Sequence, residues 1–369
     1  MQAERMRIEQ ILRRAMAENV APAIALGVSR GDLPTETWYI GRHHTSRDAL
    51  RCGPETIFDL ASLTKPLSTT LWAMRLADQG RLDPRAAMET YVDVEDPALA
   101  QCPIWRLMSH TCGLPAHREY FRGLGPGSLR SGRHDFARSS LRRMLRSSPL
   151  IYAPSEGETY SDLGYLLLEW VCESIDGPLV QRWSSLPHHG PEALHFRPLG
   201  TDLDHTERYA ATEDCAWRKR LIQGEVHDDN CWTIGGVGGH AGLFGTLGAV
   251  HEAGRDWLKA LRSEPNSMGL DPEIVPYWTD RNRMHPHGTR VLGWDTPTPG
   301  ASTSGQFFGR RSIGHLGFTG TSLWIDPDKE VVITLLTNRV SPSRDNVGIR
   351  WLRPALHDAG WLWAEGRFT

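Results

Sequence analysis

Residues 57–84 read IFDLASLTKPLSTTLWAMRLADQGRLDP. The apolar residues of this stretch recur at the spacing of one helical face: Leu63, Leu67, Leu71 and Met74. Proline is tolerated only in the first turn of a helix, so Pro66 predicts a helix that begins near Ser62. Gly80 is well placed to end it, because glycine readily adopts the left-handed conformation that follows a last helical turn.

The same stretch places Lys65 three residues after Ser62, in the pattern S-x-x-K. Residues three apart share one face of a helix, so the hydroxyl and the amine can meet, although chance also produces this common spacing. A serine hydroxyl needs a base to become nucleophilic. Lysine, with an ordinary pKa near ~10.4, is a poor base unless burial or nearby cations lower that value. If the pair is catalytic, we therefore expect a lowered pKa for Lys65.

Composition limits the classes of protein that this chain can represent. Its 369 residues favour two domains, and its net charge of −3 argues against a nucleic-acid or anionic-membrane partner bound mainly by electrostatics. No stretch approaches the ~18 uncharged apolar residues of a membrane span. The charged, periodic segment 1–20 predicts an amphipathic helix rather than a secretory signal. The six cysteines form no C-x-x-C pair and are expected to be reduced, so we expect a cytoplasmic globular protein.

Strand patterns occur at both ends of the chain, with helical patterns between Pro- and Gly-rich loops in the middle. The expected strands are 22–31, 35–42, 311–318, 321–328 and 329–340. The expected later helices are 163–175, 247–261 and a closing helix at 347–361. The strongly basic segment 127–148 is expected to form a solvated helical face and loop.

These patterns predict an α/β (α+β) fold with one antiparallel sheet built from the N- and C-terminal segments and flanked by helices. A mostly helical domain is inserted into it. We expect residues 1–84 and 286–369 to form the sheet domain and residues 85–285 the helical domain, with the active site at their interface.

Three other patterns suggest alternative chemistry, and each has a weakness. Gly27–Gly31 matches the G-x-S-x-G elbow around Ser29, but this serine lies inside an expected strand that a hairpin follows. Residues 236–241 resemble a dinucleotide fingerprint, but without a βαβ unit they favour a glycine-rich loop beside a pocket. The pairs His43-His44 and His188-His189 lack the spacing of metal ligands, so no metal site is expected.

Two further motifs follow S-x-x-K in order. Tyr160-Ser161-Asp162 precedes an apolar helix, and His315-Leu316-Gly317 lies in an expected C-terminal strand. With the stretch LMSHTCGLP at 107–115, the glycine-rich segment 226–246 and the segment 314–327, these motifs resemble the class C β-lactamase-like and penicillin-binding serine hydrolase superfamily. That superfamily includes β-lactamase-like esterases, DD-peptidases and D-aminopeptidases. The resemblance covers residues from about 20 to 340.

The resemblance implies a nucleophile, Ser62, that shares its proton with Lys65 and Tyr160 and forms an acyl-enzyme. It also implies that the backbone N–H groups of Ser62 and Phe318 hold the carbonyl oxygen, with His315, Gly317 and Asp162 beside the substrate. Tyr160 is then the candidate for activating the hydrolytic water.

Two positions depart from the family pattern. Asp162 replaces the usual asparagine, and an ionised carboxylate cannot donate a hydrogen bond to a substrate carbonyl. His315 stands where many members have lysine, and a neutral histidine is a weaker anchor for a substrate carboxylate. Both changes argue against a β-lactam substrate.

The leading hypothesis is therefore a carboxylesterase that acts on a small ester and needs no cofactor. An amide or peptide hydrolase (a D-aminopeptidase or β-lactamase), an acyltransferase with the same acyl-enzyme, and an inactive ligand-binding homologue are the alternatives. The sequence leaves the natural substrate and the oligomeric state open.

Overall fold

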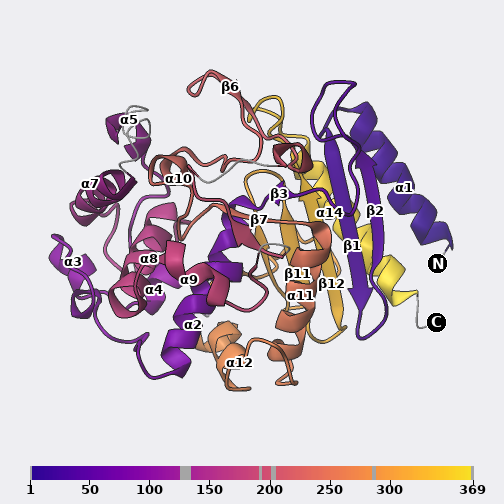
Figure 1. Ribbon diagram of the computed structural model, residues 1–369. Helices are drawn as coiled ribbons and strands as arrows, with labels where there is room; N and C mark the ends of the chain where they lie inside the picture. Colours follow the sequence, from indigo (N-terminus) through magenta and orange to yellow (C-terminus); the bar gives the residue numbers. More distant parts are fainter. Residues whose placement is uncertain (1, 125–133, 191–192, 201–204, 285–287, 367–369) are drawn as a thin grey trace.

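The computed structural model describes residues 2–124, 134–190, 193–200, 205–284 and 288–366, and Figure 1 shows it as a ribbon. Its main element is a seven-stranded sheet in which every strand pairs antiparallel with its neighbours. In spatial order the strands are β2 (Glu36–Gly41), β1 (Ala23–Arg30), β12 (Val331–Thr337), β11 (Ser322–Asp326), β10 (Ile313–Leu316), β9 (Trp294–Asp295) and β8 (Arg290–Val291). The N-terminal hairpin joins the C-terminal strands through β1 and β12, which confirms the expected sheet.

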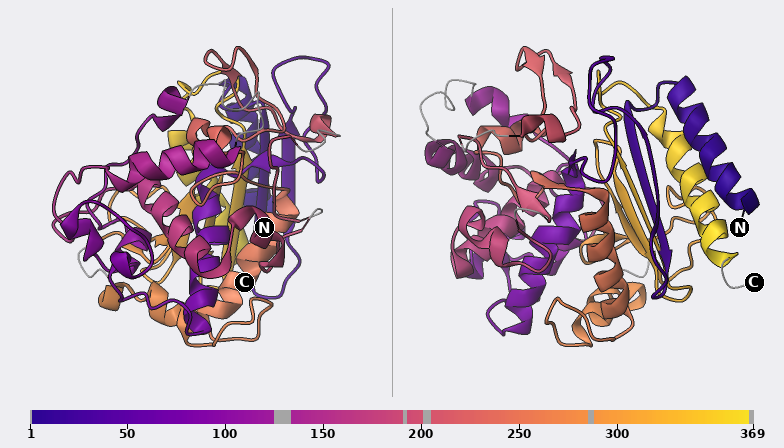
Figure 2. Two further views of the ribbon diagram at one scale, coloured as in Figure 1. Left: turned by 60° about the vertical axis from the view of Figure 1, so that its left-hand side comes forward. Right: turned by 45° about the vertical axis from the view of Figure 1, so that its right-hand side comes forward.

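Helices cover both faces of this sheet. Figure 2 shows α1 (Gln2–Ala17) and α14 (Ile349–Glu365) on one face, with α11 (Leu247–Leu261) on the other. Because neither face meets solvent, strands β1 and β12 are buried along their whole length, apart from the half-buried Arg30. Ile8 and Leu12 of α1 pack into the core with Leu352 of α14. The expected helices 1–20, 247–261 and 347–361 are thus confirmed.

The remaining helices form the part of the molecule away from β1 and β2 (Figure 1). They are α2 (Leu71–Asp78), α3 (Pro97–Ala100), α4 (Trp105–Met108), α5 (Tyr120–Leu124), α7 (His134–Arg146), α8 (Asp162–Asp176), α9 (Leu179–Arg182), α10 (Asp229–Thr233), α12 (Ile274–Thr279) and α13 (Arg281–Met284). Short strands complete the chain: β3 (Phe58–Asp59), β4 (His195–Phe196), β5 (Asp214–Cys215), β6 (Arg220–Leu221) and β7 (Leu243–Gly245). Strands β3, β7 and β4 form a small second sheet.

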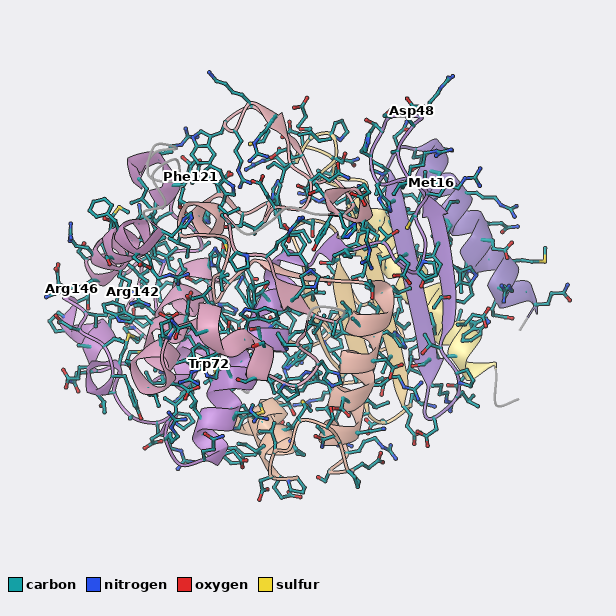
Figure 3. The ribbon with its side chains drawn as sticks, viewed as in Figure 1. Met16, Asp48, Trp72, Phe121, Arg142 and Arg146 are labelled. Atoms are coloured by element: carbon teal, nitrogen blue, oxygen red, sulfur yellow. The ribbon has the colours of Figure 1, made fainter. Side chains whose placement is uncertain are left out.

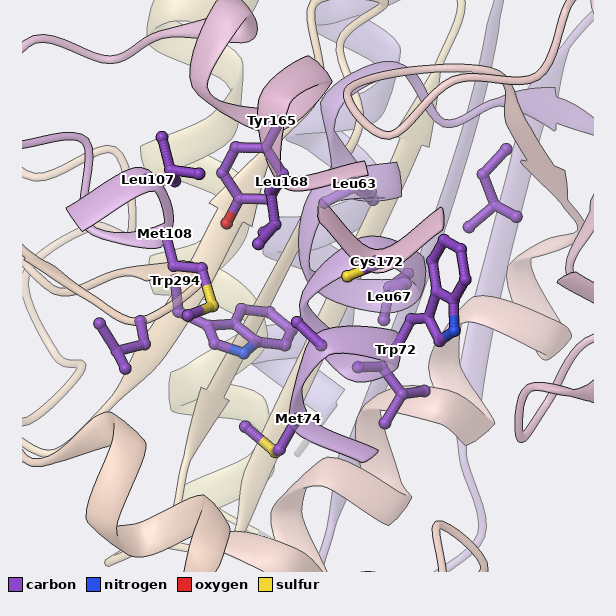
Figure 4. Close-up of a cluster of buried hydrophobic side chains, with 14 of the residues drawn as sticks. Leu63, Leu67, Trp72, Met74, Leu107, Met108, Tyr165, Leu168, Cys172 and Trp294 are labelled. Atoms are coloured by element: carbon purple, nitrogen blue, oxygen red, sulfur yellow. The ribbon is translucent and has the colours of Figure 1, made fainter. Parts of the chain in front are cut away.

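Helix α2 runs through the centre of the apolar core. Figure 4 shows Leu67, Trp72 and Met74 within a cluster of buried side chains that α4, α8 and Trp294 of strand β9 complete. Gly80 follows this helix at φ +68°, as its expected terminating role requires. Burial on this scale fixes the helix, and with it the residues just before it, against both the sheet and the helical region.

The domain division at 84/85 and 285/286 stays a prediction. Helix α11 lies within the segment that the division assigns to the helical domain, yet it packs on strands β11 and β12. None of the described helices combines the length and the apolar character that crossing a bilayer requires. The six cysteines, all in the described part, are free thiols, and five of them are buried.

The basic segment 127–148 is only in part the solvated helical face and loop that the sequence predicts. Residues 127–133 lie outside the described residues, and the rest is largely helix α7. Figure 3 shows Arg142 and Arg146 of this helix near the edge of the molecule. However, Arg138 is ion-paired with Glu169 of α8, and Arg142 is ion-paired with Glu173. These two ion pairs hold α7 against α8, so part of the basic segment has a structural role.

Candidate active site

Ser62 lies in a single 3-10 turn, Ala61–Leu63, and a π-helical turn, Lys65–Thr70, leads from it into α2. The expected helix start near Ser62 is confirmed, but its first turns are not α-helical. Ala61 adopts φ +47°, a conformation that is uncommon for a residue with a Cβ. Irregular turns and strained residues of this kind concentrate at functional sites.

Lys65 is fully buried, and its Nζ donates a 2.9 Å hydrogen bond to Ser62 Oγ. The same ammonium donates to Asp162 Oδ1 at 2.7 Å and to the carbonyl of His240 at 3.2 Å. Burial alone would lower the pKa of Lys65, but the Asp162 carboxylate outweighs it and raises the pKa above its ordinary value. The expected lowering of the Lys65 pKa is therefore wrong, because Asp162 supplies a buried counter-charge.

Asp162 is the first residue of α8, and Ser161 caps that helix by accepting the N–H of Gly164. Burial opposes ionisation of Asp162, but Lys65 and a hydrogen bond from His117 bring its pKa below the ordinary range. The second oxygen, Oδ2, lies 3.3 Å from His117 Nδ1. The residue that replaces the usual asparagine thus pairs with the catalytic lysine candidate.

Tyr160 packs against the same lysine, with Lys65 Nζ 4.8 Å from the centre of its ring. The ring centres of His110 and Tyr160 lie 4.5 Å apart, and His110 Nδ1 accepts the N–H of Ser161 at 3.0 Å. The stretch 107–115 therefore supports the Tyr160 loop, a role that sequence reasoning did not assign. The phenolic oxygen of Tyr160 is buried and interacts with Lys65 and Ser62, although none of these contacts has the alignment of a regular hydrogen bond. Burial raises its pKa, while the Lys65 charge opposes that shift.

The third motif lies on β10 and in the turn after it. His315 is 2% exposed rather than facing solvent, and burial, aided by Lys65, lowers its pKa to about 3. His315 is therefore neutral at physiological pH. Phe318 is 50% exposed, and its ring lies between His227, 5.7 Å away, and the guanidinium of Arg339.

The third motif and the Ser62 turn are tied together by hydroxyl groups. Thr319 Oγ1 donates to the carbonyl of Asp59 at 2.7 Å, and Thr321 Oγ1 donates to that of Leu60 at 3.1 Å. The fit is close enough that a Cβ on Gly317 would lie 2.6 Å from the Leu60 carbonyl oxygen. These bonds hold the nucleophile candidate beside the end of β10.

Asp59 is a positioning residue that the motif analysis missed. Its buried carboxylate accepts the N–H of Ala61 at 2.8 Å and that of His227 at 2.6 Å. It thereby stabilises the turn that carries Ser62 and joins it to the segment before α10. An aspartate two residues before a helix start was its only sequence signal.

A cavity of about 600 Å³ joins these groups. Of the residues proposed from the sequence it is lined by Ser62, Tyr160, Asp162, His315, Gly317 and Phe318, and the buried Lys65 lies beneath it. Residues that the motifs did not indicate also line it, including His117, Asp228, Arg290, Arg339 and Arg353. The glycine-rich loop contributes His240 and Ala241, which agrees with the expected approach of its backbone to a pocket.

Two of the three alternative patterns, the G-x-S-x-G match and the histidine pairs, lie outside this arrangement. Ser29 is buried on β1 and bonded to His251 Nε2 at 2.8 Å, with no place among the residues lining the cavity. His43 contacts Thr56, whereas His188 contacts Asp256.

One group in the cavity has the spacing of metal ligands, although no metal site was expected. Side-chain ligand atoms of His117, Asp162 and Asp228 lie within 4.8 Å of one another. Both carboxylates already have partners, since Asp162 accepts from Lys65 and Asp228 lies 2.9 Å from His240 Nε2. These contacts account for the cluster without a bound cation.

The protein has an antiparallel sheet between helices, with Ser62 and Lys65 about one turn apart just before α2. This is the architecture of a β-lactamase-like serine hydrolase. The chain belongs to the Beta-lactamase family, whose model matches residues 8–356. The resemblance that the three motifs indicated is thereby confirmed.

Curated relatives are putative D-alanyl-D-alanine carboxypeptidases. The one from Escherichia coli K12 is 28% identical over 312 residues, which cover 77% of this chain and 69% of the relative. The one from Salmonella paratyphi A is 29% identical over 357 residues, covering 85% of this chain and 77% of the relative.

Solved structures share the fold at lower identity. EstCE1, a hydrolase with promiscuous acyltransferase activity, is 19% identical with a TM-score of 0.72, over 98% of this chain and 99% of that one. The octameric penicillin-binding protein homologue from Pyrococcus abyssi is 19% identical with a TM-score of 0.70, over 96% and 76%.

Proposed function

We propose that this protein hydrolyses carboxylic esters through an acyl-enzyme on Ser62. The observation that carries the proposal is the chain of contacts from Ser62 Oγ to Lys65 Nζ, 2.9 Å, and on to Asp162 Oδ1, 2.7 Å, beside a 600 Å³ cavity. Ser62 thus lies against a buried, oriented cation and close to Tyr160, which is the candidate for the base that a serine hydroxyl needs.

The chemistry divides into two displacements. The reacting form is the one in which Tyr160 is a phenolate beside the Lys65 ammonium. This phenolate takes the proton of Ser62 as Oγ attacks the acyl carbon, and it gives that proton to the leaving alcohol as the bond between alcohol and acyl carbon breaks. The phenolate then takes a proton from water, which attacks the ester of Ser62, and returns that proton to Ser62 Oγ as the carboxylic acid is released. Because Asp162 keeps Lys65 protonated, we assign Lys65 the role of a fixed cation that stabilises the phenolate of Tyr160.

Two features of the cavity favour an ester over a β-lactam. His315 is neutral and so provides no fixed charge for a substrate carboxylate. Asp162 is engaged with Lys65 and His117 and has no N–H with which to hold an amide carbonyl.

A second candidate is the carboxypeptidase activity in the names of the curated relatives. Arg339 and Arg353 line the cavity, and within the described part of the chain neither forms an ion pair with a carboxylate. They could hold the terminal carboxylate of a peptide. An acyltransferase would use the same acyl-enzyme, with an alcohol in place of water.

The test is a burst-phase assay with p-nitrophenyl acetate and butyrate, beside nitrocefin and a peptide ending in D-Ala-D-Ala. Intact-protein and peptide mass spectrometry follow the same mixtures. An ester burst with an acyl group on the peptide holding Ser62 supports the proposal. Efficient cleavage of the D-Ala-D-Ala peptide with slow ester turnover would favour the second candidate, and no adduct on Ser62 from any substrate would refute the acyl-enzyme.

A further inference from the structure

The turn between β10 and β11, Gly317–Thr321, is held by two arginines that bind its carbonyl groups. Arg353 of α14 donates from Nη2 to the carbonyl of Gly317 at 2.6 Å and to that of Thr321 at 2.9 Å. Arg339, just after β12, donates from Nε to the carbonyl of Phe318 at 2.8 Å. We propose that Arg353 is a positioning residue that orients and polarises the Phe318 N–H as an oxyanion donor. This inference rests on the proposed Ser62 acyl-enzyme.

The orientation follows from the geometry of one peptide group. The carbonyl of Gly317 and the N–H of Phe318 belong to the same planar, trans unit and point in opposite directions. Holding that carbonyl toward α14 turns the N–H away from α14. Gly317 is in contact range of Leu60, two residues before Ser62, and both Gly317 and Phe318 line the cavity with Ser62.

The Phe318 N–H is left available for a ligand. The turn forms its own hydrogen bonds from the Gly317 N–H to the Thr321 carbonyl and from the Gly320 N–H to the Gly317 carbonyl, and the Thr319 carbonyl accepts the Arg339 N–H. Across the described residues, no hydrogen bond is donated by the Phe318 N–H. A turn whose Gly317, Phe318 and Thr319 carbonyls are occupied while the Phe318 N–H stays free has the polarity that a developing oxyanion requires.

Charge adds a second effect. A cation on the carbonyl side of an amide strengthens the N–H on the other side as a donor, because hydrogen bonds in series polarise one another. Arg353 has no carboxylate partner in the described part of the chain, and burial, with Arg339 nearby, lowers its pKa. Keeping a guanidinium in such a place is costly, and its use here is the donation of two hydrogen bonds from Nη2 to two carbonyl groups of one turn.

The experiment compares Arg353→Ala and Arg353→Lys with Arg350→Ala, an exposed arginine almost one turn earlier on α14. The substrate is neutral p-nitrophenyl butyrate, so that binding of a substrate carboxylate plays no part. Removing an oxyanion donor outright costs about 10²–10³ in kcat. For Arg353→Ala we expect kcat to fall by about 10–100-fold with KM within about twofold, for Arg353→Lys a smaller loss, and for Arg350→Ala no change.

Two further readouts separate positioning from a general structural role. Guanidinium chloride, below denaturing concentration, should restore part of kcat to Arg353→Ala only. A boronic acid that forms a tetrahedral adduct with Ser62 should bind Arg353→Ala about 10–100-fold more weakly than wild type. If Arg353→Ala does not fold, Arg353→Gln, which removes the charge but keeps an N–H donor, takes its place and should show the same selective loss of kcat.

Unchanged kcat, or a rise in KM alone, would overturn the inference. So would a kcat loss on the neutral ester with unchanged affinity for the boronic acid. Failure of the proposed function itself is distinguishable, because wild-type enzyme would then show no acyl group on Ser62 at all.

Discussion

The Lys65 ammonium and the Asp162 carboxylate form a buried ion pair, with Nζ and Oδ1 2.7 Å apart. Its consequence is that Lys65 remains a cation in the free enzyme, although the nucleophile pattern alone suggested a neutral base. The proposed mechanism then assigns proton transfer to Tyr160, and each of the following variants addresses one part of that arrangement.

Asp162→Asn should lower the pKa of Lys65 toward neutrality, because burial then acts without the opposing charge. We expect a loss of stability of about 3 kcal/mol at pH 7, the lower end for breaking a buried pair, since the amide oxygen still accepts a hydrogen bond. Asp162 has a lowered folded-state pKa, so its contribution is present above pH ~3.9 and is lost below it. Urea unfolding at pH 7, 5 and 3 should therefore show the difference between wild type and variant shrinking only at pH 3. A constant difference at all three values would contradict the ionic role.

Ser62→Ala should abolish ester turnover and labelling by a fluorophosphonate while the fold is retained. Ser29→Ala is the matched control, because it removes the serine of the alternative G-x-S-x-G pattern. It should cost about 1–3 kcal/mol by leaving Nε2 of the buried His251 without its partner, but the remaining folded enzyme should turn over normally. Activity lost only in Ser29→Ala would transfer the nucleophile to that site.

Tyr160→Phe should separate catalysis from stability. The phenolic oxygen is buried and makes no well-aligned hydrogen bond to a described residue, so removing it should change the free energy of unfolding by less than about 1 kcal/mol. Turnover should fall by about 10²–10⁴, the usual contribution of a positioned acid or base. Thermal unfolding and steady-state kinetics on one preparation measure both. A destabilised variant with normal kcat would show that the hydroxyl is structural.

Gly317→Ala should displace the turn from the nucleophile. The new Cβ would lie 2.0 Å from Thr321 Oγ1 and 2.6 Å from the Leu60 carbonyl oxygen, so the backbone must move. We expect about 1–3 kcal/mol of destabilisation, typical of overpacking, together with a lower kcat. Gly53→Ala, where a Cβ meets nothing within 4 Å, should affect neither quantity. Equal effects of the two substitutions would argue against close packing at residue 317.

The free energy of unfolding should begin to fall at a pH well above the range in which carboxylates titrate. Burial lowers the pKa of His251, His315 and His357 to about 3 each, so these residues are neutral in the fold but charge near pH ~6.5 when unfolded. Their stabilisation is therefore complete above pH ~6.5 and declines as the pH falls. Urea unfolding between pH 8 and 4 should show this slope, and His357→Gln, distant from Ser62 in the chain, should make it shallower. A plateau down to pH 4.5 would contradict the expectation.

Local patterns were sufficient for the elements and the three motifs. Helical spacing through Leu67 and Met74, the proline at 66 and the glycine at 80 located the helical run that begins near Ser62 and ends with α2, because those preferences act within a few residues. They did not show that its first turns are 3-10 and π rather than α. Alternation and turn residues likewise located β1, β10, β11 and β12. The order of S-x-x-K, Y-S-D and H-L-G then indicated the family that the comparison confirms.

The tertiary structure decided the pKa shifts within the site and which residues position its backbone. Residues 65 and 162 are 97 positions apart, so only folding could show that Asp162 reverses the expected pKa shift of Lys65. The same holds for Arg353, which reaches the site from a segment that carries no motif. A sequence pattern records which residue types are near in the chain, whereas charge interactions and hydrogen bonds depend on which groups burial brings together.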